Sequence, residues 1–110
     1  MKIDKSLMTG STTLLVLSLL GQEEMYGYQI ITELARRSDQ TFLLKEGTLY
    51  PILHTLEAER LVISHEQKAE TGRMRKYYRI TKKGERALEE KKKEWAYFTE
   101  KVNAVVCAPV

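Results

Sequence analysis

Residues 61–84, with the sequence LVISHEQKAETGRMRKYYRITKKG, decide how this chain folds. Residues 61–66 are rich in β-branched side chains, and residues 75–80 alternate in side-chain character, as extended strands do. The polar segment 67–73 between them contains Gly72, a residue that tight turns favour. The pattern predicts a β-hairpin with a flexible basic tip.

Three helices are expected before this hairpin. Apolar residues recur at helical spacing within residues 4–20, at about residues 27–37, and from residue 46 or 47 to about residue 60. Gly10 weakens the early part of the first helix, so we expect the main helix to start near Ser11. The chain of 110 residues therefore fits one domain that is mainly helical.

Pro51 sets a limit on the third helix. Proline lacks a backbone N–H and is best tolerated in the first turn, where N–H groups have no partner within the helix. We therefore expect Pro51 in the first turn.

A long helix is expected after the hairpin, from Lys82 to Val105 or Val106, with Thr81 as its N-terminal cap. Apolar residues recur along it at steps of seven, three, four and three, interrupted by Lys91, which is the spacing of a coiled-coil seam. The seam consists of Leu88, Trp95, Phe98, Val102 and Val105. Such a stripe is costly when exposed, so a partner helix from a second copy is predicted to cover it.

Three helices followed by a hairpin form the order of the winged helix-turn-helix, in which the hairpin is the wing. The predicted fold class is mainly α with a small β-hairpin. We assign residues 1–81 to a winged helix-turn-helix DNA-binding domain and residues 82–110 to a C-terminal dimerisation helix and tail.

The distribution of charge supports a nucleic-acid partner more strongly than the net charge of +3 does. The segment from His65 to Lys83 holds seven cations and only two acids, Glu66 and Glu70. The cations are Lys68, Arg73, Arg75, Lys76, Arg79, Lys82 and Lys83. Basic residues on a wing suit the phosphates of double-stranded DNA, although a solvated wing without a partner is the alternative.

Polar residues on the third helix are candidates for contacts to base edges or phosphates. They are Thr48, Tyr50, His54 and Thr55, with the cation Lys45 just before the helix. On the wing, Tyr77 interleaves with the cations and its phenol can donate to a phosphate oxygen. The alternative for Tyr50 is a packing role. The alternative for His54 is an ordinary surface histidine, and this is the favoured interpretation for His65.

Other classes of function find little support. One cysteine, Cys107, cannot form an intrachain disulfide or a multi-cysteine zinc site, and it suggests a reducing, cytoplasmic compartment. The apolar run at residues 14–20 is too short to span a bilayer, and no signal peptide is expected. There is no glycine-rich phosphate loop, metal-ligand spacing or nucleophile paired with a base, so we expect no cofactor, no metal and no enzyme activity.

Four sequence blocks are similar to the PadR family of bacterial transcriptional regulators. They are Met25-Tyr26-Gly27-Tyr28, residues 45–53 (KEGTLYPIL), Leu56-Glu57, and residues 72–84 (GRMRKYYRITKKG). The resemblance covers residues 14–95, and the short chain with one terminal helix resembles the smaller branch of the family. The family usually has glycine near position 60 and proline at 74, where this chain has Arg60 and Met74.

The resemblance implies a homodimeric regulator, most simply a repressor that reads a pseudo-palindromic operator. It implies that Thr48 and Tyr50 contact DNA and that the tip from Thr71 to Arg73 reaches the adjacent groove or backbone. It also implies dimerisation through the terminal helix with help from the first helix, where Leu14 lies. Trp95 corresponds to a tryptophan on which some small-branch members stack planar ligands, so a small aromatic effector is a possible partner; a plain seam residue is the alternative.

A protein-interaction module on the same scaffold is a competing hypothesis, because fold does not determine function. It predicts no salt-dependent DNA binding and a wing that tolerates charge reversal.

Overall fold

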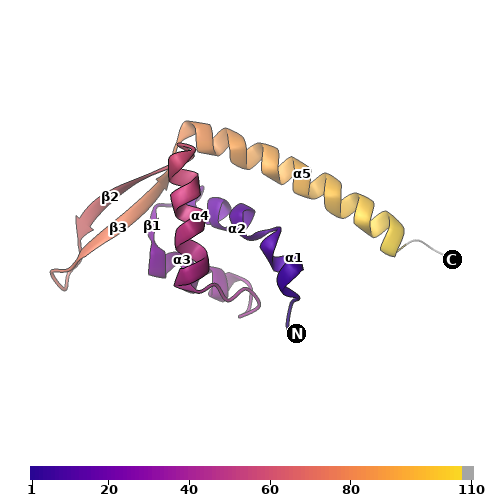
Figure 1. The fold of residues 1–110 in the computed structure, drawn as a ribbon, viewed down its shortest axis with the longest axis horizontal. Coiled ribbons are helices and arrows are strands. Elements are labelled where there is room, and N and C mark those ends of the chain that lie inside the picture. The colour runs from indigo at the N-terminus through magenta and orange to yellow at the C-terminus, as the bar shows by residue number, and fades with distance from the viewer. Residues whose placement is uncertain (108–110) are drawn as a thin grey trace.

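The computed structural model describes residues 1–107, and it is mostly helical with one small antiparallel sheet (Figure 1). Its elements in chain order are α1 (Lys5–Thr9), α2 (Thr12–Leu20), β1 (Met25–Tyr26), α3 (Gly27–Arg37), α4 (Glu46–Ala58), β2 (Val62–Lys68), β3 (Met74–Ile80) and α5 (Lys82–Val106). The wing projects from one side of the helical body and α5 extends from the other (Figure 1). The winged helix-turn-helix with a long C-terminal helix is confirmed.

The first predicted helix is divided in two. Asp4 caps α1 by accepting a hydrogen bond from the Ser6 backbone N–H at 2.9 Å, and α1 ends at Gly10. The main helix α2 starts after Ser11, as the glycine indicated. Because α1 has no fully buried residue and α2 has five, α2 supplies the core, and α1 only packs Met8 against it.

A strand that the sequence pattern did not indicate lies just before α3. The two residues of β1 pair with β3, with Met25 opposite Tyr78 and Tyr26 opposite Tyr77, so the sheet has the order β1-β3-β2. Two residues are too few to show an alternating pattern, which is why the sequence predicted a two-stranded hairpin.

Pro51 lies in the second turn of α4, so its prediction for the first turn is wrong. The helix begins at Glu46, where the apolar spacing predicted it, and the Lys45 carbonyl accepts from the backbone N–H groups of Thr48 and Leu49, both at 3.0 Å. Proline at this position leaves the carbonyl four residues earlier, that of Gly47, without its helical donor. Gly47 is exposed, so water can hydrate that carbonyl.

The turn from α4 into the wing requires an unusual backbone conformation at position 60. Arg60 has φ +62°, the left-handed conformation that glycine adopts most easily. The Leu61 N–H donates to the Leu56 carbonyl at 2.9 Å, and the Arg60 N–H donates to the Glu57 carbonyl at 3.0 Å. These bonds close the end of α4, so the turn forms with arginine where the family usually has glycine.

The core joins every long element. Its members are Val16, Leu17, Leu19, Leu20, Met25, Ile30, Leu34, Leu44, Leu49, Leu53, Leu56, Leu61, Val62, Tyr78 and Leu88. Leu88 is only 5% exposed, so its predicted place on an exposed dimer seam is wrong. The first turns of α5 dock onto the body of the protomer, which covers Leu88, and the exposed part of the seam begins at Trp95.

Candidate nucleic-acid interface

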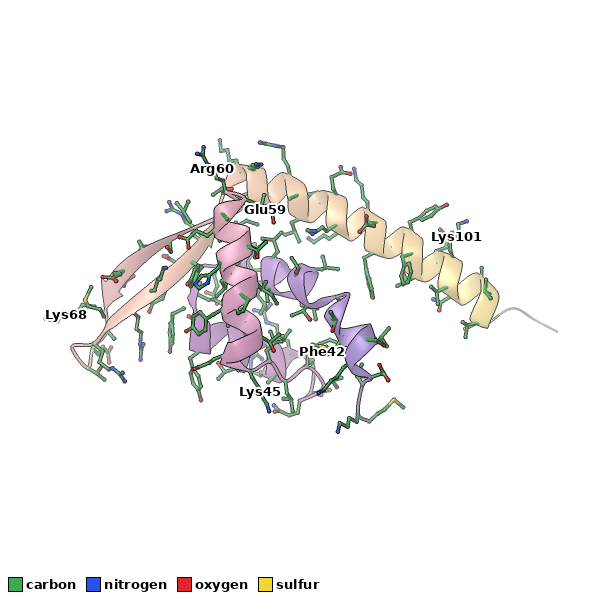
Figure 2. All side chains as sticks on the ribbon, viewed as in Figure 1. Phe42, Lys45, Glu59, Arg60, Lys68 and Lys101 are labelled. Carbon is green, nitrogen blue, oxygen red and sulfur yellow. The ribbon has the colours of Figure 1, made fainter. Side chains whose placement is uncertain are left out.

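Helix α4 presents one face to the core and the other to solvent. Leu49, Leu53 and Leu56 are buried, whereas the predicted contact residues Thr48, Tyr50, His54 and Thr55 are exposed. Lys45 is exposed at the start of the helix, at the end opposite Glu59 and Arg60 (Figure 2). The outer face of α4 is therefore free to enter a groove of DNA, which is about 12 Å wide on the major-groove side.

A cleft connects α4 with the wing. It has a volume of about 460 Å³ and is lined by Tyr26, Gly27, Tyr28, Tyr50, Arg73, Met74, Arg75 and Lys76. The structure thus brings predicted residues of the third helix and of the wing to one place. Lys45, Thr48 and His54 are not among the residues that line this cleft.

Four residues of this cleft escaped the analysis of charge and periodicity, namely Tyr26, Gly27, Tyr28 and Met74. Tyr28 is 61% exposed, and Gly27 is buried beneath Tyr50. Tyr26, Gly27 and Tyr28 belong to the Met25–Tyr28 block, which was the available signal, but only folding places that block beside the wing.

The tip of the wing is a tight turn. The Ala69 N–H donates to the Arg73 carbonyl at 2.8 Å, and the Gly72 N–H donates to the Ala69 carbonyl at 2.9 Å. Gly72 has φ +89°, which explains why a glycine lies here. Thr71 and Arg73 are exposed at this tip, and Lys68 closes β2 beside it (Figure 2).

Arg75 and Tyr77 are already engaged within the protein. Tyr77 lies between the rings of Tyr26 and His65, with centroid separations of 5.4 and 5.8 Å. The Arg75 guanidinium lies 4.4 Å from the centre of the Tyr26 ring. Both residues are half-buried, so their position favours a role in stiffening the base of the cleft.

Glu57 ties the wing to α4. Its carboxylate accepts a hydrogen bond from the Ser64 hydroxyl and lies 3.8 Å from the Lys76 ammonium. Burial raises the pKa of Tyr78, and the negative charge of Glu57 acts in the same direction. Lys76 therefore has an internal partner, whereas Arg73 has no ion pair among residues 1–107.

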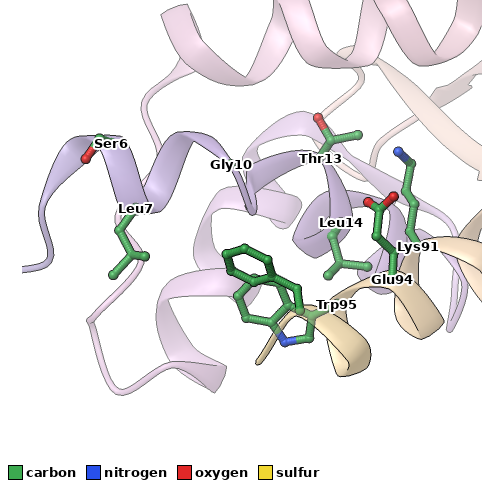
Figure 3. Close-up of a pocket in the computed structure, with 9 residues that line it drawn as sticks. Ser6, Leu7, Gly10, Thr13, Leu14, Lys91, Glu94 and Trp95 are labelled. Atoms are coloured by element: carbon green, nitrogen blue, oxygen red, sulfur yellow. The ribbon is translucent and has the colours of Figure 1, made fainter. Parts of the chain in front are cut away.

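A second hollow lies between α1, α2 and α5 (Figure 3). It has a volume of 340 Å³ and is lined by Ser6, Leu7, Gly10, Thr13, Leu14, Lys91, Glu94, Trp95 and Phe98. The rings of Trp95 and Phe98 lie 6.1 Å apart and are 42% and 55% exposed. The predicted seam residues Trp95 and Phe98 thus share this hollow with Leu14.

The apolar surface continues along α5. Val102 is 38% exposed and Val105 is 80% exposed, and Leu7 of α1 is 63% exposed at the edge of the hollow. We call this surface, formed by Leu7, Trp95, Phe98, Val102 and Val105, the α5 seam. Each of these side chains is exposed in the structure of residues 1–107.

Two further features are absent from residues 1–107. None of the helices in this part of the chain combines the length and the apolar character that crossing a membrane requires. In the same residues, no three His, Cys, Asp or Glu side chains are grouped so that they could hold a metal ion.

Known proteins resemble this chain in sequence and in fold. Residues 16–90 match the family described as the transcriptional regulator PadR-like family. The transcriptional regulator Rv3488 of Mycobacterium tuberculosis is 40% identical over 75 residues, which are 68% of this chain and 66% of that protein.

Two solved structures superpose closely. A transcriptional regulator from Clostridium thermocellum matches with a TM-score of 0.86 and 32% identity, over 94% of this chain and 98% of that one. The PadR-like regulator BC4206 of Bacillus cereus matches with a TM-score of 0.82 and 32% identity, over 94% and 99%. These relatives are transcriptional regulators and not enzymes.

Proposed function

This chain belongs to the PadR-like family of transcriptional regulators, and we propose that it is a sequence-specific repressor that acts as a homodimer on a pseudo-palindromic operator. The observation that carries the proposal is the cleft in which Tyr50 of α4 meets Arg73 and Lys76 of the wing. A helix that reads base edges and a basic wing that neutralises phosphates are the two parts that such a regulator needs.

Two copies would present two α4 helices to one face of DNA. Half-sites are then expected about one helical turn apart, about 34–36 Å, or somewhat further. The α5 seam supports the proposal that a second copy binds, because an apolar stripe of this length is costly when it is exposed to water.

Arg73→Ala should weaken DNA binding for all sequences and reduce its dependence on salt. Each lost phosphate contact lowers the slope of log affinity against log salt by about 0.9, so a dimer that loses two contacts should lose about 2. The measurement is a titration of labelled operator and of unrelated DNA at several salt concentrations.

Arg86→Ala is the matched control for this variant. Arg86 is exposed on α5, away from the cleft, and its loss changes the net charge by the same amount. If both variants keep the wild-type slope, Arg73 makes no phosphate contact; if the wild-type protein shows no salt-dependent binding at all, the proposed function itself fails.

We further propose that a planar aromatic effector binds in the hollow beside Trp95 and alters the spacing of the two α4 helices. The volume of 340 Å³ lies within the usual range of ligand sites, about 300–1,000 Å³. An effector shifts such an equilibrium only by its difference in affinity for the two spacings.

Trp95 is the single tryptophan of the chain, so its fluorescence reports on this hollow. Titration with the aromatic probe anilinonaphthalene sulfonate should quench Trp95 saturably. Phe98→Ala, inside the hollow, should weaken the quenching, whereas Tyr97→Ala, an exposed aromatic that does not line the hollow, should not. Equal behaviour of the two variants would argue against a ligand site here.

A further inference from the structure

Gly27, at the start of α3, lies directly beneath the Tyr50 side chain. A Cβ atom built on Gly27 would lie 2.5 Å from the Tyr50 hydroxyl oxygen, 3.0 Å from Cζ and 3.3 Å from Cε1. A separation of 2.5 Å is well inside van der Waals contact, so Tyr50 cannot keep this position above any side chain larger than hydrogen.

The backbone of Gly27 does not itself require glycine. Gly27 is the first residue of α3, and its φ is not positive. Among the glycines of residues 1–107, only Gly72 has a positive φ. Alanine could adopt the same helical conformation, and it favours helices over glycine by about 0.8–1.0 kcal/mol. The Tyr50 ring is therefore the group that excludes a side chain at position 27.

The position of Tyr50 decides where its hydroxyl meets a ligand. Tyr50 is 37% exposed, and its side chain shares the cleft with Arg73 and Lys76 of the wing. A ring that is displaced from Gly27 must turn toward the wing or toward solvent, because the added methyl group would occupy part of its present place. Either movement shifts the hydroxyl by more than the few tenths of an ångström that a hydrogen bond tolerates.

We propose that Gly27 is a positioning residue for DNA recognition: its missing side chain seats the Tyr50 ring between α3 and the wing. This inference rests on the proposed function, and it adds a residue that touches no DNA itself. Gly27 acts through Tyr50, so its effect must depend on the presence of the tyrosine ring.

A double-mutant cycle tests this dependence. Gly27→Ala should weaken operator binding about tenfold, equivalent to about 1.4 kcal/mol, and Tyr50→Ala should weaken it at least as much. In the Tyr50→Ala background the ring atoms are absent, so adding Gly27→Ala should change operator binding by less than about twofold. Equal losses from Gly27→Ala in both backgrounds would show a general packing role for Gly27 and overturn the proposal.

The salt dependence supplies a second readout. Because the Tyr50 hydroxyl is uncharged, Gly27→Ala should lower affinity while the salt slope stays at the wild-type value. A reduced slope would mean that the wing cations have moved, which contradicts a role confined to Tyr50.

These outcomes are separate from the test of the proposed function. A wild-type protein that binds operator with a slope sensitive to Arg73→Ala, but with unchanged affinity in Gly27→Ala, would leave the function standing and reject the role of Gly27. Thermal unfolding of each variant confirms that the proteins compared are folded.

Discussion

Gly84→Ala should lower the free energy of unfolding by about 3 kcal/mol or more, the upper end of what overpacking a core usually costs. A Cβ atom at Gly84 would lie 2.0 Å from the Leu61 carbonyl oxygen and 2.7 Å from Ile80 Cγ1. The Leu61 carbonyl cannot easily move, since it accepts hydrogen bonds from the Thr81 backbone N–H and hydroxyl at 3.0 and 3.1 Å. Chemical denaturation followed by circular dichroism measures the loss.

Gly47→Ala is the matched control, because it makes the same chemical change within another helix. No atom lies within 4 Å of a Cβ built on Gly47, so this variant should gain stability, by up to about 1 kcal/mol. Similar unfolding midpoints for the two variants would show that the start of α5 does not pack against the wing as closely as the structure has it.

Val102→Asp should convert the proposed dimer to a monomer. Val102 lies in the middle of the exposed part of the α5 seam, and a partner helix would bury the new carboxylate without a counter-charge. An uncompensated buried charge costs about 3–5 kcal/mol, so the dissociation constant of the dimer should rise by at least about 100-fold. Sedimentation velocity at micromolar concentration measures the change.

Ala104→Asp controls for the effect of aspartate on the helix. Ala104 is exposed and lies two residues further along α5, about 200° around the helix from Val102. This variant should remain a dimer and keep its affinity for the operator, whereas Val102→Asp should lose both. A dimer that survives Val102→Asp would place the subunit interface away from the α5 seam.

Much of the fold could be predicted from local patterns. The boundaries of α3 and α5 follow from apolar spacing and the Thr81 cap, whose side chain accepts from the Gly84 N–H at 3.0 Å. The wing follows from two strand patterns around a polar loop. These features depend on neighbours in sequence, which is why periodicity and turn chemistry find them.

The errors arose where distant segments meet. β1 is too short to leave a pattern and exists because β3 lies alongside it. Leu88 fits the seam by spacing, but the first turns of α5 pack against the body, with the Leu88 side chain close to Gly21. The error at Pro51 is instead local: α4 begins at Glu46, so Pro51 lies in its second turn, and the Gly47 carbonyl that loses its donor faces solvent.

The candidate site shows the same division. The exposed face of α4 could be predicted, because burial of every third or fourth residue leaves Thr48, Tyr50 and His54 outside. The roles of Arg75 and Tyr77 could not, since their aromatic partners come from β1 and β2. The part played by Gly27 depends on a ring that is 23 residues away in sequence.

The sequence by itself determined the order of helices and strands, the basic character of the wing and the apolar seam of α5. Those properties depend on the spacing and charge of residues that are neighbours in the sequence. Only the tertiary structure decided which cations are engaged inside the protein, where the seam becomes exposed, and that Tyr50 rests on a glycine of another helix. Close packing determines these features, because a contact between distant segments depends on atomic distances that no local pattern contains.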